Sequence, residues 1–281
     1  MNIINVEQWD ITDPIPTEQT IDFQISKIDD FPNLNYINYN LTESINKLGL
    51  DQTQLIINQI FHKLKLNPKE TVWTCQHISV DNLKFYGSIV FTPHATNKNK
   101  YNSISHYPVN ASQRISIKDK NIKASFRGSF DTNIIRTMIF DYLKGKEGCL
   151  IKDTGDWHFD NKNKDKNHSD YINDLRNSKI VICPRGTGPS TIRMWEALAS
   201  GCIPLVISND YVFPLEDVID WRKCVLTLPE EQIPIIPQYI DAISDDRLES
   251  MQKYGKKVYL EWFSPSAMHK PVIEILKQIC K

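Results

Sequence analysis

The sequence predicts an α/β protein of two domains, each built around a mainly parallel sheet. The chain has 281 residues, 41% of them hydrophobic, which is enough to form two cores. Residues 179–208 follow a strand–loop–helix–strand pattern of βαβ length, which implies parallel strands. Strand-like and helix-like segments also alternate in the first half. We expect domains 1–147 and 148–281, the second ending in helices from about residue 244.

The individual elements follow from apolar periodicity and from breaker residues. Gly201 ends a helix, because glycine is favoured just past a helix C-terminus. The stretch 160–170 is polar and charged, which is typical of a loop. The predicted strands cover 72–80, 84–92, 121–127, 179–183 and 203–208, and the predicted helices cover 51–65, 133–144 and 190–200.

Composition excludes several classes of function. The formal net charge of -1 gives no sign of nucleic-acid binding. No apolar window is long enough for a membrane span, and the N-terminus lacks the features of a secretory signal. We therefore expect a cytoplasmic protein. The six cysteines lack metal-ligand spacing, so we expect free thiols and no metal; the oligomeric state is not indicated.

The strongest local signal lies at residues 184–196, in the loop after a predicted buried strand and in the helix that follows. Open α/β sheets bind ligands at this place, and a helix N-terminus offers unpaired N–H groups to a phosphate. Gly186 and Gly188 let the backbone approach a ligand closely, and Ser190 and Thr191 add hydroxyl donors.

Charged side chains in the same segment fit a nucleoside diphosphate. Arg185 lies in the loop and Arg193 one turn into the helix, and guanidinium groups match phosphate oxygens. Glu196 lies on the same helix face as Arg193 and can accept hydrogen bonds from ribose hydroxyls. The alternative is that the loop is only a turn and that Arg193 and Glu196 form an ion pair on the protein surface. The segment matches neither the P-loop pattern nor GxGxxG.

Several motifs in order resemble the exostosin-like family of glycosyltransferases, the family 47 type. The run SKIVICPRGTGPSTIRMWEALASGCIPLVIS (178–208) carries most of the likeness, which continues through 209–214 and 217–221. Upstream, Phe126-Arg-Gly-Ser129 and Ile135-Arg136 resemble two further family motifs. The likeness covers about half of the chain. Because the chain shows no anchor, it resembles the stand-alone members of microbes or large DNA viruses, and we expect it in the host cytoplasm if a virus encodes it.

The resemblance implies a GT-B fold, with two Rossmann-like domains facing a cleft. It also implies an inverting transferase that takes a UDP-sugar without an essential metal, and the chain has no Asp-x-Asp signature. We therefore expect transfer to a glycan hydroxyl with a β-linkage, UDP-xylose being the favoured donor. No cofactor is expected, because the UDP-sugar is a substrate.

The resemblance also suggests roles for particular residues. The leaving diphosphate would be met by Arg185, Arg193 and the backbone of 188–191, with Arg127 and Ser129 reaching in from the first domain. Arg136 is a weaker candidate, because an arginine on a helix more often supports structure.

The general base is expected in the first domain. The family commonly has an Asp-His pair there, whereas Gln76 precedes His77 in this chain. We take His77 and Asp81 as candidates, with His94 and His106 less favoured. The departure at Gln76 keeps a second function open, a non-catalytic nucleotide- or carbohydrate-binding protein. A sugar-nucleotide epimerase is disfavoured, because GxGxxG is missing.

Overall fold

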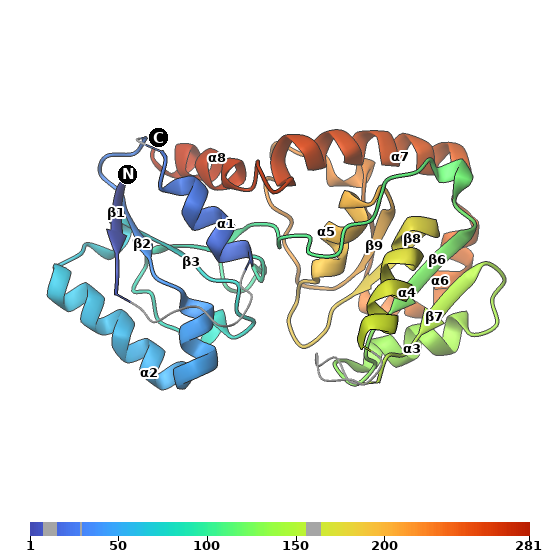
Figure 1. Cartoon of the computed structure of the whole chain (residues 1–281), viewed down its shortest axis with the longest axis horizontal. Helices are drawn as coiled ribbons and strands as arrows, with labels where there is room; N and C mark the ends of the chain where they lie inside the picture. The colour runs from blue at the N-terminus through green and yellow to red at the C-terminus, as the bar shows by residue number, and fades with distance from the viewer. Residues whose placement is uncertain (8–15, 29, 156–163) are drawn as a thin grey trace. The chain divides into compact units, whose positions relative to one another are not determined.

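The computed structural model describes residues 1–281 except 8–15, 29 and 156–163, and it divides into two compact units (Figure 1). The first unit contains Met1–Tyr107, Asp210–Leu215 and Pro265–Lys281. The second contains Pro108–Asn209 and Glu216–Ser264.

The sheet of the second unit is parallel throughout its described strands. In pairing order these are β10 (Leu226–Leu228), β9 (Ile203–Ile207), β8 (Ser178–Pro184), β6 (Ile122–Arg127) and β7 (Cys149–Lys152). The chain leaves β6 for β7 on one side and then returns to β8 on the other side. This reversal creates a topological switch point between β6 and β8, where the loops that follow the two strands separate.

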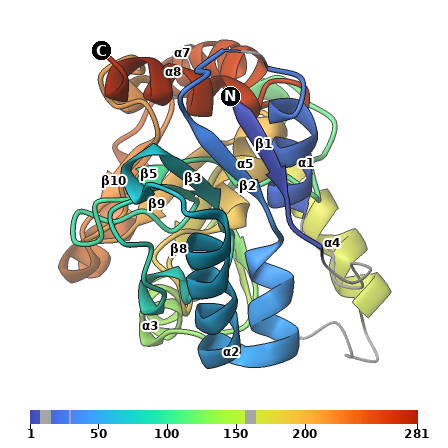
Figure 2. The ribbon, with the colours of Figure 1, turned by 90° about the vertical axis from the view of Figure 1, so that its left-hand side faces the viewer.

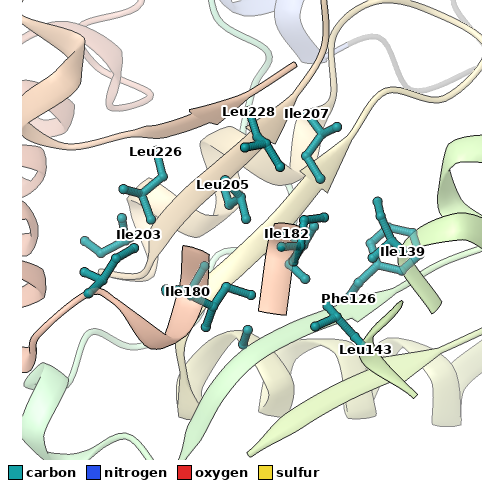
Figure 3. Close-up of a cluster of buried hydrophobic side chains, with 14 of the residues drawn as sticks. Phe126, Ile139, Leu143, Ile180, Ile182, Ile203, Leu205, Ile207, Leu226 and Leu228 are labelled. Carbon is teal, nitrogen blue, oxygen red and sulfur yellow. The ribbon is translucent and has the colours of Figure 1, made fainter. Parts of the chain in front are cut away.

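Helices surround this sheet, and apolar side chains fill the space between. Ile180 and Ile182 point to the face on which α3 places Ile139 and Leu143 (Figure 3). Their chain neighbour Val181 points to the other face and is also buried, as expected for a parallel sheet covered on both sides. The helices are α3 (Ile134–Leu143), α4 (Lys164–Asn177), α5 (Ile192–Ala199), α6 (Ile236–Asp241) and α7 (Asp245–Val258), with a π-helical turn at Tyr259–Phe263.

The first unit has its own parallel sheet, whose described strands pair in chain order. They are β1 (Asn2–Asn5), β2 (Asn35–Asn38), β3 (Thr71–Thr74), β4 (Ile89–Thr92) and β5 (Asn102–Ser103). Its helices are α1 (Pro16–Ile25), α2 (Leu41–Leu64) and α8 (His269–Ile279).

The helices of the first unit cover both faces of its sheet. Tyr36 and Val72 pack with α1 and α8, whereas Ile37 and Trp73 pack with α2. The split follows the alternation of side chains along a strand. Helix α2 changes direction at Gly49, whose φ of 81° and ψ of 173° are not helical (Figure 2).

Short 3-10 turns link these elements, namely η1 (Pro68–Glu70), η2 (Val80–Asn82), η3 (Ile117–Asp119), η4 (Trp221–Lys223) and η5 (Glu230–Ile235). In the described part of the chain no helix has the length and apolar character needed to cross a membrane.

The predicted domain boundary at 147/148 differs from the division that the structure makes at Tyr107/Pro108. Strand β6 hydrogen-bonds to β7 and β8, so it belongs to the second sheet together with α3. The C-terminal helices divide between the units, α7 in the second and α8 in the first. Local sequence patterns give the elements but not the sheet that each strand joins.

Most predicted elements are present, with three differences. The strands expected over 72–80 and 84–92 are shorter, because the chain turns after β3 and again before β4. The loop expected over 160–170 is wrong from residue 164 onward, where α4 begins; residues 160–163 lie outside the described residues. Few apolar side chains mark α4, so its periodicity is weak.

Two carboxyl groups, the buried Glu18 and the half-buried Asp22, lie one turn apart on α1. Glu18 accepts hydrogen bonds from the Thr42 hydroxyl and, at 2.6 Å, from the backbone N–H of Gln76. Asp22 accepts a hydrogen bond from the hydroxyl of Tyr36. Burial raises the pKa of Glu18 to about 8 and that of Asp22 to about 7. Both groups therefore tend to hold a proton near neutral pH in the folded state.

These raised pKa values predict that the first unit becomes less stable as the pH rises from 4.5, the ordinary pKa of a glutamate, to about 8. The folded state binds protons that the unfolded chain has already released, so stability is lost as the pH passes through the folded pKa values. Calorimetric melting should show the first unit's transition falling over this range and levelling off above about pH 8. Glu18→Gln, which mimics the protonated carboxyl, should flatten the fall. Asp51→Asn, at an exposed carboxylate, is the control. If the melting temperature falls with pH as steeply in Glu18→Gln as in this control, the assignment is contradicted.

Candidate active site

The candidate site lies in the second unit, where the loops after β6 and β8 separate at the switch point. Residues 128–133 follow β6 and lead to α3, and residues 185–191 follow β8 and lead to α5. Both loops therefore lie at the carboxyl edge of the sheet, the ligand-binding edge of open α/β sheets.

Arg193 extends from α5 to the end of β6. Its Nη2 donates a hydrogen bond of 2.6 Å to the carbonyl oxygen of Arg127, and its guanidinium carbon lies 4.4 Å from the ring centre of Phe126. Its Nε is buried and has no hydrogen-bond partner among the described residues. Arg193 thus has one unsatisfied buried donor beside the loop after β6 among the described residues.

Arg136 extends in the opposite direction, from α3 toward both loops. Its Nη1 donates to the carbonyl oxygen of Ser129 at 2.8 Å, and its Nε donates to that of Arg185 at 3.2 Å. Its guanidinium carbon also lies near Phe126, 5.5 Å from the ring centre. Burial, together with the charge of Arg193, lowers the pKa of Arg136 to about 10. An anion between the two loops would relieve this unfavourable electrostatic environment.

Two glycines make room for the two arginines. A Cβ on Gly128 would lie 2.7 Å from Nη2 of Arg193, and a Cβ on Gly186 would lie 2.8 Å from Nη2 of Arg136. The arrangement is crossed, because each guanidinium, coming from the helix after one loop, lies against the glycine of the other loop. We call Arg193 and Arg136, together with the glycines that they contact, Gly128 and Gly186, the crossed arginine pair.

Arg185 and the segment that follows it lie at the same edge. The backbone N–H of Arg185 donates to Ile207 at the end of β9, and its buried Nε has no hydrogen-bond partner among the described residues. Its Nη1 lies 3.8 Å from Glu230 Oε1, too far for a hydrogen bond. Thr191 is the N-cap residue of α5 and makes no side-chain capping bond. Gly188 and Ser190 are buried beside it.

The structure brings Arg127 and Glu196 into protein networks that the sequence did not reveal. Arg127 lies in the second unit, contrary to our expectation, and its side chain pairs with Asp174 at 2.7 Å and with Asp170 at 3.3 Å, both on α4. Glu196 is buried, and its two oxygens accept hydrogen bonds from Asn110 and from the Tyr171 hydroxyl. Ribose binding by Glu196 remains a prediction that requires these bonds to rearrange.

Two residues stabilise the loops more than the sequence suggested. Ser129 is buried, and its carbonyl accepts the hydrogen bond from Arg136. Asn133 caps α3 and donates from Nδ2 to the carbonyl of Gly186 at 3.2 Å. An asparagine just before an amphipathic helix is a capping signal that could have revealed this contact.

The candidate bases lie in the first unit, after β3. Nδ1 of His77 accepts a hydrogen bond of 3.0 Å from the backbone N–H of Ser79, which places the proton of the neutral ring on Nε2. Burial lowers the pKa of His77. Asp81 lies in η2 with its side chain exposed, and one oxygen accepts from Asn99 at 2.9 Å.

Gln76 has a structural role in this turn. Its Oε1 accepts hydrogen bonds from the backbone N–H groups of Thr17 and Glu18 at the start of α1. His94 contacts the carbonyl oxygen of Gln76 through Nε2, and its ring lies against that of His106. Burial lowers the pKa of His94 to about 4. His94 is therefore a buried group that supports this turn, and His106 is half-buried beside it.

The two α/β units define the GT-B class of fold. The structure of Anabaena HepE in complex with UDP and glucose is similar, with a TM-score of 0.52 over 88% of this chain and 78% of that chain. Its sequence is 9% identical, so this likeness concerns the fold alone.

Comparison with known families matches residues 61–243 to the Exostosin GT47 domain, and the chain belongs to this family. It is 26% identical to Exostosin-1 of Drosophila melanogaster over 137 residues, which is 46% of this chain and 18% of the relative. It is 35% identical to a probable glycosyltransferase of Arabidopsis thaliana over 89 residues (32% and 19%). A probable glucuronosyltransferase of Oryza sativa subsp. japonica is 32% identical over 83 residues (30% and 20%). The matches thus span about a fifth of each relative.

The crossed arginine pair predicts that Gly128→Ala and Gly186→Ala impair anion binding more than folding. The added methyl displaces the end of a flexible side chain, so the melting temperature should change little, whereas UDP affinity should fall by about tenfold. Gly145→Ala is the reciprocal control, because its φ of 74° makes alanine strained while its surroundings are open. It should lower stability and leave UDP affinity unchanged. Native UDP affinity in both loop variants would contradict the arrangement.

Proposed function

We propose that this chain is an inverting glycosyltransferase, which moves a sugar from a UDP-sugar to a glycan hydroxyl without an essential metal. The observation that carries the proposal is the crossed arginine pair at the switch point of the second unit. Membership of the exostosin GT47 family supports sugar transfer as the reaction.

The guanidinium groups supply the charge that a leaving diphosphate needs. Arg193 and Arg185 each have a buried Nε–H without a partner among the described residues, and Arg136 adds a third positive charge beside them. Donors fixed in advance where charge develops lower the barrier, because they need not reorganise during the reaction. We infer that these groups take the place of a divalent cation at the diphosphate.

Inversion requires a single displacement. The acceptor oxygen attacks the anomeric carbon as the bond from that carbon to the diphosphate oxygen breaks. UDP leaves with the electron pair, and a general base takes the proton of the acceptor hydroxyl. An α-linked donor therefore gives a β-linked product.

Asp81 is the better of the two candidate bases. It is exposed and has one carboxylate oxygen that accepts no hydrogen bond from the described residues. His77 uses its Nδ1 lone pair for the N–H of Ser79, so it must release that bond or change tautomer before it can accept a proton. Asp81 can act without such a change.

A second function has one specific observation in its favour. Gln76 occupies the place of the family's usual acidic residue and instead caps α1. A chain that binds the nucleotide sugar but does not transfer it would fit this change. UDP binding without turnover of any donor would select this alternative.

The donor sugar is tested by a turnover screen in the presence of EDTA. UDP-xylose is the donor that we favour, and UDP-glucuronic acid belongs in the panel because of the name of the rice relative. Release of UDP from one donor supports the proposal and identifies the sugar.

Arg193→Ala should weaken UDP binding at least about tenfold, equivalent to about 1.4 kcal/mol, because it removes a charged donor from the diphosphate. Calorimetric titration measures this directly. Arg222→Ala is the matched control, because Arg222 is an exposed side chain that pairs only locally with Asp220. Equal UDP affinity in the Arg193 and Arg222 variants would exclude Arg193 from the site.

Asp81→Asn should lower donor turnover by about a hundredfold or more while UDP still binds, because the amide cannot accept the proton. His77→Ala should have the smaller effect. Asp51→Asn, an exposed carboxylate on α2, serves as the control. Full activity in both the Asp81 and His77 variants would place the base elsewhere.

A further inference from the structure

An open pocket of about 350 Å³ lies in the first unit, between the end of α2 and the turn before β4. Its lining residues are Asn58, Phe61, His62, Leu66, Pro68 and Tyr86. None of the described residues that line it is a lysine, an arginine or a carboxylic acid. The pocket is therefore suited to a small uncharged ligand.

The backbone presents Tyr86 in an unusual way. Tyr86 and Gly87 have φ values of 56° and 88°, and the N–H of Ser88 donates to Phe85 at 3.0 Å, which closes a tight turn. A tyrosine is strained at positive φ, where asparagine or glycine is favoured. Even so, Tyr86 is 53% exposed to solvent. Strain retained at an exposed aromatic residue points to a role outside folding.

Neighbouring side chains fix the position of the tyrosine ring. Phe61 lies edge-on to it, with ring centres 5.6 Å apart, and Phe61 also contacts the buried ring of Trp73. The Tyr86 hydroxyl donates to Asn58 Oδ1 at 2.7 Å. The ring is thus a fixed, half-exposed aromatic surface.

Polar groups at the edge of this surface remain available. Asn58 Oδ1 already accepts from Tyr86 and, at 2.9 Å, from Gln54, which fixes the amide so that its NH₂ group makes no bond to the described residues. The ring of His62 likewise makes no hydrogen bond with the described residues and is exposed. An apolar surface bordered by such donors matches a sugar ring, which has one C–H face and hydroxyl groups around its edge.

We propose that this pocket is a subsite for a neutral pyranose unit of a glycan, stacked on Tyr86 and hydrogen-bonded to Asn58 and His62. It uses none of the residues assigned to the donor or the base. That its natural occupant is a unit of the acceptor glycan rests on the proposed function.

The test is a titration of the full chain, without nucleotide, with methyl β-D-xylopyranoside, methyl β-D-glucopyranoside and methyl β-D-galactopyranoside, followed by saturation-transfer NMR. At least one glycoside should receive saturation. Tyr86→Asn should weaken its binding by about fivefold or more and should melt no lower than the unsubstituted chain, because asparagine tolerates positive φ. Asn58→Asp, which keeps the acceptor and removes the N–H donors, should also weaken binding. Tyr142→Asn, at an exposed tyrosine of α3, is the control that should bind normally.

Equal binding by the Tyr86→Asn variant and the unsubstituted chain would overturn the subsite, as would saturation of none of the three glycosides. UDP titration of the same samples keeps this result separate from the proposed function. If the unsubstituted chain binds a glycoside but no UDP, and Tyr86→Asn weakens the glycoside binding, the donor site is refuted and the pyranose subsite is supported.

Discussion

The candidate site of the second unit depends on two guanidinium groups that lie close together and partly buried at the switch point between β6 and β8. Arg193 and Arg136 both lie against Phe126. Arg193 is held by a backbone carbonyl at the end of β6, and Arg136 by carbonyls of the loops after β6 and β8. Like charges at such a place disfavour each other, and burial adds to that cost. The loops, the two glycines and the capping bond of Asn133 all serve to keep this arrangement. An anionic ligand is the group that would make it favourable.

The sheet explains why the charges can meet at all. The chain runs from β6 outward to β7 and returns on the other side as β8, so the helices that follow β6 and β8 start from neighbouring loops. The arginine of each helix therefore lies against the loop that precedes the other helix. A glycine at the point of contact is required, because a Cβ there would lie less than 3 Å from a guanidinium nitrogen.

In the first unit, hydrogen bonds between α1 and the turn after β3 hold the polar groups in position. Glu18 joins α1 to the turn after β3 through the N–H of Gln76, and Gln76 returns two hydrogen bonds to the start of α1. This reciprocal contact fixes the turn that leads to His77. A protonated Glu18 makes the stability of the turn sensitive to pH, whereas Asp81 is exposed to solvent.

Sequence reasoning was strongest where local pattern and motif coincide. The βαβ unit at 179–208 and the exostosin family were both predicted and confirmed. In this segment an apolar run, a loop with glycines and an arginine, a helix and a second apolar run follow one another directly in the sequence. The sheet that β6 joins, the burial of Glu196 and the ion pairs of Arg127 were missed, since each depends on partners distant in the chain. The exposure and positive φ of Tyr86 could not be predicted from sequence, because its conformation is set by the turn and by Phe61.

The most direct test of the account is a calorimetric titration of the chain with UDP, UMP and uridine, with EDTA present throughout. If the arginines bind the diphosphate, affinity should fall steeply from UDP to UMP and again to uridine, and EDTA should have no effect. Uridine that binds as tightly as UDP, or UDP binding that EDTA abolishes, would contradict the claim that guanidinium groups hold the leaving diphosphate.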